Sequence, residues 1–593
     1  MTTRLRAAGQ SVPVGGDLAA VIGLGAFCAI LTIVTWRTWG DIGSDLGYDL
    51  LAASRVADGE LPYADFIYYY GPLSVGVLGL GAWLTGTVLG AAIGIGVMMA
   101  TAIVLATYAL ARTQVGPLGA AIAAGITAPL AFAPNNLSFV LPHSFSASFA
   151  ILASLGFLIG LGRYADTGRA LWLTAAGALA GFVVLTRPEF AVAVIMAATL
   201  WLVLRARVGI GGVREFTLFA VPLVAIPVAV YGTFLTQVSV SRLVFENLYP
   251  LDFLAGSGGT LLRAYAPLTP SSFAQLGLKT ALYAAGAAGL VVVAWLLSRH
   301  GRLRRPLTAM MVLGATLVAV ASVARPETLR YYLEFVYAWI PAGAAVAVIV
   351  LLWRFRTRSG TWSSADQVAL AGGVVLMVLA AKTYNAFLFY APEPQLAVYA
   401  APFVAVFLAR LHLDELGRTR TAYALGAAWL GFLVLSGTGL TLKDARAKSA
   451  EVRDSGGWLR DDPADARLFN TALDWIERET GPGDYVLVGP QLQALYVLSG
   501  RRAPLEQLSL LPDALGGPEK ELAAASELDR KHVRLVVIDE RQFPEFDQTS
   551  FGDSFSQSLA AWIAKHFKRA AVLRGAGDRN VVVWVRRERL DRS

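Results

Sequence analysis

The chain has 593 residues, of which 56% are hydrophobic and only 16% are charged, and its mean hydropathy is +0.56. A soluble enzyme usually carries about 25% charged residues and contains no series of apolar runs near 20 residues long, so the composition excludes a large soluble enzyme. The formal net charge of +8 does not indicate a nucleic-acid partner, because the arginines lie in short clusters between apolar runs, a pattern that reflects membrane topology.

The apolar runs predict a polytopic α-helical membrane protein with about 13 transmembrane helices, since a hydrocarbon core about 30 Å thick requires roughly 20 apolar residues of helix. The first run is too long for a signal peptide and no small-residue cleavage site follows it, so we interpret it as an uncleaved span. It contains Cys28, the single cysteine, which excludes an intrachain disulfide. The stretch 72–86 and the two short runs around Arg187 fit a complete span least well. The predicted spans are 18–36, 88–111, 117–133, 144–162, 170–186, 189–204, 216–235, 278–298, 307–323, 335–353, 366–382, 397–411 and 422–440.

Arginines in the connections between spans predict the orientation. Every second connection is basic, whereas the alternate ones are longer, less positive and rich in Tyr, Pro and Asp. We therefore expect the basic set and the N-terminus in the cytoplasm and, because the number of spans is odd, everything after about residue 441 outside. The frequent Arg, Ala and Gly indicate a GC-rich bacterium, so we expect a multi-pass protein of the inner membrane. The basic set contains Arg112, Arg163, Arg169, Arg205, Arg207, Arg214, Arg299, Arg302, Arg304, Arg305, Arg354, Arg356, Arg358, Arg410, Arg418 and Arg420; the other set comprises 37–71, 134–143, 187–188, 236–277, 324–334 and 383–396.

The last part of the chain changes character, because the charge content rises and the apolar runs shorten to strand length. Four runs have the length and composition of strands, and two have the periodicity of amphipathic helices. The chain therefore divides into a transmembrane part, 1–440, and a soluble extracytoplasmic α/β domain, 441–593, packed on the outer face. The predicted strands are 485–488, 494–498, 533–538 and 581–585, and the predicted helices are 468–479 and 555–567.

The first outer connection places carboxylates and tyrosines directly after the first span. An ionisable side chain at the membrane edge is a candidate for function. Transfer of a sugar from a phosphate leaving group needs a carboxylate that accepts the acceptor's proton and cations that hold the departing phosphate. The alternative is a solvated acidic loop with a belt of tyrosines at headgroup level. The candidate side chains here are Asp41, Asp45, Tyr48, Asp49, Tyr63, Asp65 and Tyr68.

This connection resembles the first extracytoplasmic loop of the GT-C glycosyltransferases, in particular the bacterial group related to protein O-mannosyltransferases and lipid A aminoarabinose transferases. The resemblance lies in the paired small residues Ala52-Ala53 and in the segment Asp58-Gly59-Glu60-Leu61-Pro62-Tyr63-Ala64-Asp65-Phe66. Counted back from these residues, the catalytic Asp of the family corresponds to Asp45. The family often has Asp-Glu at this point, where the chain has Asp45-Leu46, so Asp49 and Asp41 are the alternatives for the working carboxylate.

A second stretch that resembles the family is Leu185-Thr186-Arg187-Pro188-Glu189, where two short helices meet at the outer face. The resemblance implies that Arg187 contacts the carrier phosphate, which arginine can bind bidentately. The alternatives are an ion pair with Glu189 or a side chain that extends to the headgroups. Arg330 is, by weaker resemblance, a second phosphate contact, part of a donor-sugar pocket or an interfacial anchor. His143, a single outer histidine, is either structural or part of the pocket.

The resemblance implies a GT-C-like fold and an inverting enzyme that moves a monosaccharide from a polyprenyl-phosphate carrier to a hydroxyl of a cell-envelope glycan, lipid or protein. Asp45 or Asp49 is then the base, and Arg187 and Arg330 bind the donor phosphate. No cofactor or metal-ligand set is recognisable, although the acidic loop can take a divalent cation, and no nucleotide-binding motif appears in a strand–turn–helix setting. The expected substrate pocket consists of Asp41, Tyr48, Tyr63, Asp65, Tyr68, His143 and Glu189.

Two other classes of function compete with this interpretation. One is a transporter or flippase of a lipid-linked sugar, but transporters tend to have internal repeats and charged residues in mid-span, whereas the acidic residues here lie in outer connections. The other is a scaffold or assembly partner that catalyses no bond formation itself. That hypothesis gives the clustered carboxylates no function. The chain also lacks the Trp-Trp-Asp signature of oligosaccharyltransferases, which disfavours transfer of a whole oligosaccharide to Asn. The expected partners are membrane lipid, the donor lipid and the acceptor, with no nucleic acid.

Overall fold

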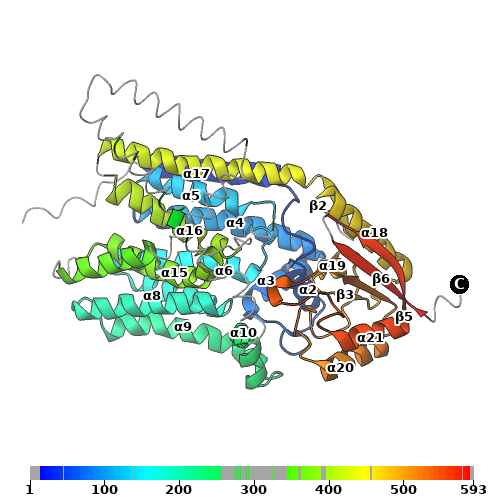
Figure 1. Ribbon diagram of the computed structural model, residues 1–593. Coiled ribbons are helices and arrows are strands. Elements are labelled where there is room, and N and C mark those ends of the chain that lie inside the picture. The colour runs from blue at the N-terminus through cyan, green and yellow to red at the C-terminus, as the bar shows by residue number, and fades with distance from the viewer. Residues whose placement is uncertain are drawn as a thin grey trace, which may run out of the picture.

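The computed structural model consists of a bundle of long helices with a mixed α/β domain packed against one of its ends (Figure 1). It describes residues 14–44, 46–135, 138–255, 343–357, 362–388, 395–417, 419–454, 457–576 and 579–587, with a few single positions between 274 and 324. The α/β domain carries the C-terminal end of the described chain, and the bundle contains everything before it (Figure 1).

The bundle helices are apolar around most of their circumference, as expected of helices that lie between lipid and one another. Within the described ranges, six helices are long and apolar enough to cross a membrane: α1 (Val14–Val34), α4 (Val88–Arg112), α6 (Phe145–Thr167), α8 (Pro188–Arg207), α9 (Val213–Phe234) and α17 (Arg420–Ala447). Further helices of the bundle are α3 (Pro72–Thr85), α5 (Pro117–Ala131), α7 (Ala170–Val184), α15 (Ser364–Leu388) and α16 (Gln395–Arg410). The chain is therefore a multi-pass membrane protein.

Each predicted span that falls on described residues coincides with a helix, which confirms the polytopic helical class. The predicted spans 278–298 and 307–323 lie outside the described residues, and the run 335–353 is described as helix over 343–357. The stretch 72–86 is α3, and the two short runs around Arg187 are the separate helices α7 and α8. The total number of spans stays a prediction.

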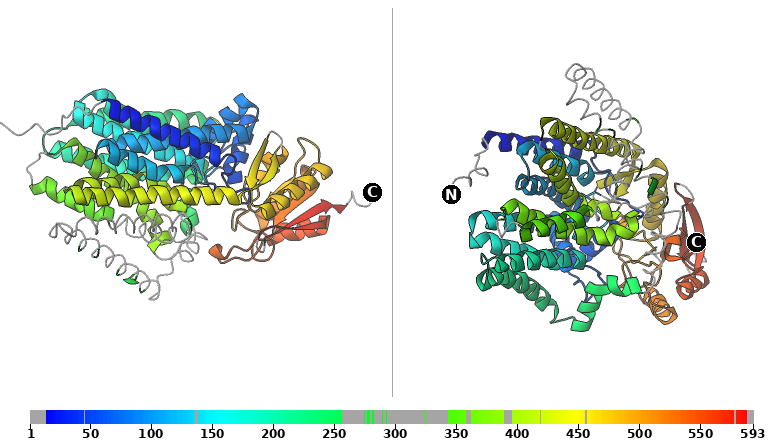
Figure 2. Two further views of the ribbon diagram at one scale, coloured as in Figure 1. Left: turned by 90° about the horizontal axis from the view of Figure 1, so that it is seen from above. Right: turned by 60° about the vertical axis from the view of Figure 1, so that its left-hand side comes forward.

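Where the structure describes them, the connections of the two predicted sets lie at opposite ends of the bundle (Figures 1 and 2). At the end remote from the α/β domain, arginines of the basic set form ion pairs with acidic side chains. These pairs are Arg112–Asp17 at 2.7 Å, Arg205–Glu215 at 2.9 Å, Arg354–Glu415 at 2.9 Å and Arg410–Asp366 at 2.7 Å. The described connections that differ in charge along the sequence therefore also lie apart in the structure. That the basic end faces the cytoplasm stays a prediction.

The α/β domain contains a four-stranded sheet in the order β3-β4-β6-β5, in which only β3 and β4 are parallel, and a separate antiparallel hairpin of β1 and β2. All five residues of β4 are buried, since both faces of the sheet are covered. Leu535 and Val537 pack with α18 on one face, and Val536 and Ile538 pack with α20 and α21 on the other. The elements are β1 (Ala450–Asp454), β2 (Gly457–Asp461), α18 (Pro463–Glu479), β3 (Leu487–Gly489), α19 (Ala494–Ser499), α20 (Pro518–Arg530), β4 (Leu535–Asp539), α21 (Gln557–His566), β5 (Phe567–Arg574) and β6 (Asn580–Arg586).

The predicted strands 485–488, 533–538 and 581–585 correspond to β3, β4 and β6, and the two predicted helices are present as α18 and α21. The prediction of a strand at 494–498 is wrong, because these residues form helix α19, which ends at Gly500 with φ +64°. A short continuous apolar run has no periodicity that distinguishes a buried strand from a buried helix. The elements β1, β2, β5 and α20 were not predicted.

The first outer connection is held between the bundle and the α/β domain through helix α2 (Leu46–Ala57) and the loop after it. A Cβ at Gly47 would overlap the backbone of Ala494, so glycine is what allows α2 and α19 to approach so closely. The loop after α2 donates the Ile67 N–H to the Glu506 carbonyl at 3.0 Å. α17 continues past residue 440 to Ala447 and leads directly into β1. The connection is therefore a packed element of the fold, and the alternative of a solvated acidic loop is wrong for its central part.

Candidate active site

Among the described carboxylates of the first outer connection, Asp49 is the buried one, with only 1% of its surface exposed. It lies in the first turn of α2, where one carboxylate oxygen accepts a hydrogen bond from the Tyr68 hydroxyl at 3.0 Å and the other accepts the Phe145 N–H at 2.7 Å. Burial raises the pKa of Asp49 above its ordinary value, against the lowering effect of the two hydrogen bonds and of nearby Arg187 and His143. A buried carboxylate with a raised pKa is suited to accept a proton.

Arg187 lies beside Asp49 at the same end of α6. Phe145, which binds Asp49, is the first residue of α6, and the next residue, Ser146, accepts a hydrogen bond from Nε of Arg187 at 3.0 Å. Arg187 immediately precedes α8 and is only 5% exposed. The positive end of the α6 dipole and a guanidinium group therefore lie together, an arrangement that favours a bound anion.

The position of Arg187 is fixed by the close approach of two chain segments. The Gly71 N–H donates to the Thr186 carbonyl at 2.8 Å, and the Leu73 N–H donates to the Leu185 carbonyl at 3.1 Å. A Cβ at Gly71 would overlap the backbone of Leu185, so this contact requires glycine. As a result, the turn between α7 and α8 is anchored to the end of the first outer connection.

Aromatic side chains enclose the two charged groups. The guanidinium carbon of Arg187 lies 4.5 Å from the ring centre of Tyr70 and 5.6 Å from that of Tyr399. Tyr68 stacks on Tyr48 with ring centres 5.7 Å apart and packs edge to face on Tyr70 at the same distance. Cation–π contacts gain strength when water is excluded, so these rings stabilise the buried arginine. Tyr63 completes the layer, since its hydroxyl donates to the Tyr70 carbonyl at 2.5 Å.

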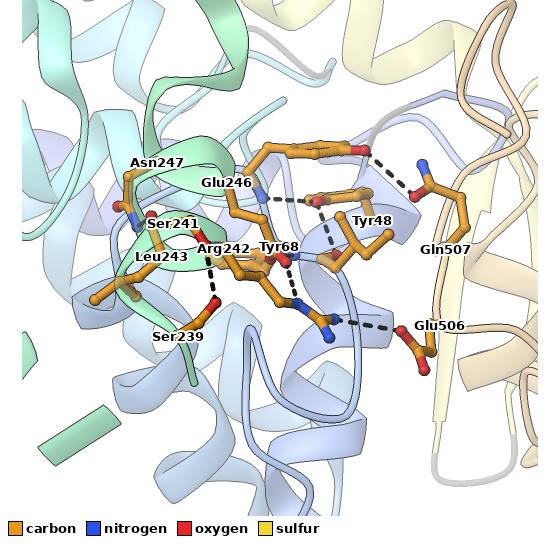
Figure 3. A network of polar contacts seen from close by, with 12 residues as sticks. Tyr48, Tyr68, Ser239, Ser241, Arg242, Leu243, Glu246, Asn247, Glu506 and Gln507 are labelled. Carbon is orange, nitrogen blue, oxygen red and sulfur yellow. Dashed lines mark hydrogen bonds and ion pairs between the residues drawn. The ribbon is translucent and has the colours of Figure 1, made fainter. Parts of the chain in front are cut away.

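Helix α10 (Val240–Ala255) and the α/β domain together hold the loop segment around Tyr68 (Figure 3). We call this pair of contacts the clasp. Glu246, only 2% exposed, accepts the Tyr68 N–H at 2.9 Å and binds Nε of Arg242 at 2.8 Å. Arg242 in turn lies 3.3 Å from Glu506 of the α/β domain. The backbone of Tyr68 is thus fixed by Glu246 while its hydroxyl binds Asp49.

The structure brings some of the predicted site residues together and not others. Tyr48, Asp49, Tyr63, Tyr68, Arg187 and Glu189 gather in one buried region, and His143 is close enough to act electrostatically on Asp49. The Arg187–Glu189 ion pair at 3.2 Å, one of the alternatives for Arg187, is present. Asp45 and Arg330 lie outside the described residues.

Asp65 and Asp41 bind their own chain and are not contacts of Asp49 or Arg187 among the described interactions. The Asp65 carboxylate accepts the Leu61 N–H at 2.7 Å and the side chain is exposed. The Asp41 carboxylate accepts the Gly43 N–H at 2.9 Å. Both carboxylates close turns, which is a common role for Asp in loops. Their predicted place in the substrate pocket stays a prediction.

Several residues of the site were missed by the sequence analysis: Ser146, Tyr70, Tyr399 and Glu246. Ser146 and Tyr399 come from helices distant in sequence, and neither has a local pattern that marks it. Tyr70 was part of the tyrosine-rich outer loop, so that composition was the available indication. Tyr399 has a buried hydroxyl without a hydrogen-bond partner in the described part of the chain, which leaves it available to a ligand.

The arrangement supports proton transfer next to an anion. Asp49 can accept a proton, and Arg187 together with the start of α6 can stabilise a negative charge. Within the ranges that the structure describes, no group of three or more His, Cys, Asp or Glu side chains is placed to hold a metal ion. A divalent cation in the acidic loop stays a prediction, since Asp45 is outside those ranges.

No family model and no curated protein sequence matches the chain. Among solved structures, it is similar to the oligosaccharyltransferase AglB from Archaeoglobus fulgidus in complex with an inhibitory peptide and a dolichol-phosphate, with 14% identity, a TM-score of 0.46 and coverage of 93% of this chain and 72% of that one. A second structure of the Archaeoglobus fulgidus oligosaccharyltransferase, in complex with Zn and sulfate, gives 16% identity, a TM-score of 0.46 and coverage of 93% and 71%.

The chain is also similar to ArnT from Cupriavidus metallidurans bound to undecaprenyl phosphate, with 15% identity, a TM-score of 0.43 and coverage of 95% of this chain and 98% of that one. These solved structures share 16% identity or less with this chain, and each TM-score is below 0.5. At such values the similarity carries no argument about the reaction of this chain.

The hydrogen bond from Tyr68 to Asp49 predicts a change in pH dependence. We expect activity to require ionised Asp49, so the acid limb of the pH–rate profile should lie above the value of 3.8 that an aspartate ordinarily has. The Tyr68 hydroxyl lowers the pKa of Asp49, so Tyr68→Phe should raise that pKa further and move the acid limb to higher pH. Tyr48→Phe is the control, because the Tyr48 hydroxyl bonds backbone groups at 67 and 69 and should leave the limb in place. An unmoved limb in Tyr68→Phe would exclude Asp49 as the titrating group.

The clasp predicts unequal effects of two glutamate substitutions on stability. Glu246→Ala leaves the buried Tyr68 N–H without its acceptor and should lower the free energy of unfolding by about 1–3 kcal/mol. Glu506→Ala removes a partner whose side chain is 63% exposed and should lower it by no more than about 1 kcal/mol. Thermal unfolding of the purified protein, followed by tryptophan fluorescence, measures the difference. Equal shifts for the two variants would show that the clasp does not act through Tyr68.

Proposed function

We propose that the protein is an inverting glycosyltransferase that moves a monosaccharide from a polyprenyl-phosphate carrier to a hydroxyl group of a cell-envelope glycan, lipid or protein. The observation that carries the proposal is the meeting of a buried base and a buried cation at one helix end. Asp49 binds the Phe145 N–H and Arg187 binds the Ser146 hydroxyl, so both are attached to the first turn of α6.

The chemistry requires both groups. Asp49 accepts the proton of the acceptor hydroxyl, and the hydroxyl oxygen attacks the anomeric carbon of the sugar. The bond between that carbon and the carrier phosphate oxygen breaks, and the phosphate leaves with the bonding electron pair. Arg187 and the start of α6 stabilise the negative charge that develops on the phosphate. Attack from the face opposite to the leaving phosphate inverts the anomeric configuration.

Two further residues belong to the proposal through the sequence resemblance. Asp45 is the alternative base, and Arg330 is a second contact for the phosphate. Asp41, Asp65 and His143 stay as expected pocket residues, with His143 supported by its electrostatic effect on Asp49. No nucleotide-binding motif is needed in this scheme, since the lipid carrier presents the activated sugar at the membrane.

The proposal also includes the placement of the protein. The end of the bundle that carries the α/β domain faces away from the cytoplasm in a bacterial inner membrane, and the basic end faces the cytoplasm. Donor lipid then reaches Arg187 from the outer leaflet, and the α/β domain lies on the side from which the acceptor arrives.

The test is native mass spectrometry of the purified wild type and of Asp49→Asn, with Asp45→Asn in parallel because either aspartate is a candidate base. A variant that keeps the pocket and lacks the base should accumulate bound donor. Enrichment of a polyprenyl-phosphate sugar on one of the two variants would support the enzyme and identify the sugar. Its absence from wild type and both variants, all with wild-type melting temperatures, would favour a transporter or flippase instead.

A further inference from the structure

A groove of about 280 Å³ opens on the surface of the bundle between the end of α1 and the start of α4. Its lining residues are Thr32, Trp36, Arg37, Gly90, Ile93, Gly94 and Val97. Nothing lies within 4 Å of the place where a Cβ of Gly94 would be, so α4 leaves this space open. None of these residues belongs to the site around Asp49 and Arg187.

The groove lies on a lipid-facing side of the bundle, near the α/β domain. Ile30 and Ile33 of α1 are 56% and 73% exposed, as expected for side chains that contact lipid. Trp36 follows the end of α1 and is 42% exposed, and tryptophan is enriched at the level of the lipid headgroups. The groove therefore lies where the headgroup and the first part of an acyl chain of a neighbouring lipid are found.

Arg37 supplies a positive charge in this groove. Its guanidinium carbon lies 5.8 Å from the ring centre of Trp36 and 4.6 Å from that of Trp458 in β2. Its Nη1 donates to the Trp458 carbonyl at 2.7 Å, and its own carbonyl accepts the Arg460 N–H at 2.7 Å. Arg37 has no ion pair among the described residues, although its side chain is held in place on both sides.

Two features of Arg37 are unfavourable for a residue with only a structural role. Its Nε is buried without a hydrogen-bond partner in the described chain, and an unsatisfied buried donor is unfavourable. Its backbone has φ +62°, a conformation that residues other than glycine rarely adopt. An acceptor with negative charge would satisfy the free donor and complement the unpaired cation.

We propose that this groove binds one phospholipid with an anionic headgroup. Its phosphate accepts hydrogen bonds from Arg37, and one acyl chain lies against the glycine face of α4 at Gly90 and Gly94. The charge of Arg37 and the apolar lining select this occupant over a zwitterionic lipid, because an anionic headgroup has no positive group of its own to repel arginine. Since Arg37 also holds β2, the bound lipid stabilises the contact between the α/β domain and the membrane end of α1.

The experiment is native mass spectrometry of the full-length protein in detergent with equal amounts of phosphatidylglycerol and phosphatidylcholine. We expect the wild type to retain phosphatidylglycerol about tenfold over phosphatidylcholine, which corresponds to roughly 1.4 kcal/mol. Arg37→Gln should abolish the preference. Gly94→Leu should reduce the retention of both lipids, because the new side chain fills the groove and leaves the contacts of Arg37 with β2 intact. Gly23→Leu, at an exposed position of α1 with open space around it, is the matched control and should behave as wild type.

Equal retention of the two lipids by the wild type would overturn the proposal, as would a preference that survives both Arg37→Gln and Gly94→Leu. Displacement of phosphatidylglycerol from the wild type by an equal amount of undecaprenyl phosphate would also overturn it and assign the groove to the carrier lipid. The helix content of Gly94→Leu, measured by circular dichroism, separates loss of the lipid from loss of the fold, because it reports whether the variant is folded independently of any stability that the lipid adds.

Discussion

Replacing Asp49 by asparagine should lower the rate of sugar transfer by a factor of about 10²–10⁴, the usual contribution of a general base. The fold should survive, because the asparagine oxygen can still accept the Phe145 N–H and the Tyr68 hydroxyl can turn to accept the new amide N–H. The loss should appear in kcat, with little change in the affinity for the donor, since Arg187 and the start of α6 remain in place.

Single-turnover transfer by the protein in lipid nanodiscs, with the donor identified by mass spectrometry, measures this effect. Asp58→Asn is the matched control, because Asp58 is an exposed carboxylate of the same connection that lies outside the proposed pocket. A variant Asp49→Asn with wild-type turnover, together with an inactive Asp45→Asn, would assign the base to Asp45. Full activity in both variants would rule out the proposed mechanism.

The sequence predicted the membrane helices well because hydropathy along a span depends on local composition alone. The opposite placement of the described connections of the two sets followed from the same kind of local information, the arginine content of each connection. The α/β domain was predicted less completely. The run 494–498 is apolar throughout because α19 is buried against α2, and a buried run of this length fits a strand equally well.

The site was predicted where its residues share a local segment. Tyr48, Asp49 and Tyr68 were expected together because they lie in one connection, and Arg187 because of a short stretch that resembles a known family. Ser146, Glu246 and Tyr399 were not expected, since each reaches the site from a helix far away in the sequence. The burial of Asp49 also depends on that packing. A single sequence holds no record of such contacts, so it presented several carboxylates as equal candidates, and the fold distinguishes buried Asp49 from exposed Asp65.

Replacing Arg187 by glutamine should weaken the binding of undecaprenyl phosphate by about 10- to 150-fold, the equivalent of losing one charged hydrogen-bonding group worth roughly 1.5–3 kcal/mol. Arg187→Lys keeps the charge but loses the Nε contact with Ser146 and the guanidinium contact with the Tyr70 ring, so it should recover only part of the affinity. Titration of the detergent-purified protein with undecaprenyl phosphate, followed by native mass spectrometry, measures the dissociation constants.

The ion pair with Glu189 provides the decisive comparison, because it is the alternative role of Arg187. Arg187→Gln alone leaves Glu189, whose side chain is 18% exposed, without this counter-charge, so a loss of binding could come from that imbalance. The double variant Arg187→Gln/Glu189→Gln removes both charges and restores neutrality. If Arg187 binds the phosphate, the double variant should melt near the wild-type temperature and still bind the lipid as weakly as Arg187→Gln. Recovery of wild-type affinity in the double variant would show instead that Arg187 serves only to neutralise Glu189, and the cation for the carrier phosphate would have to come from elsewhere in the chain.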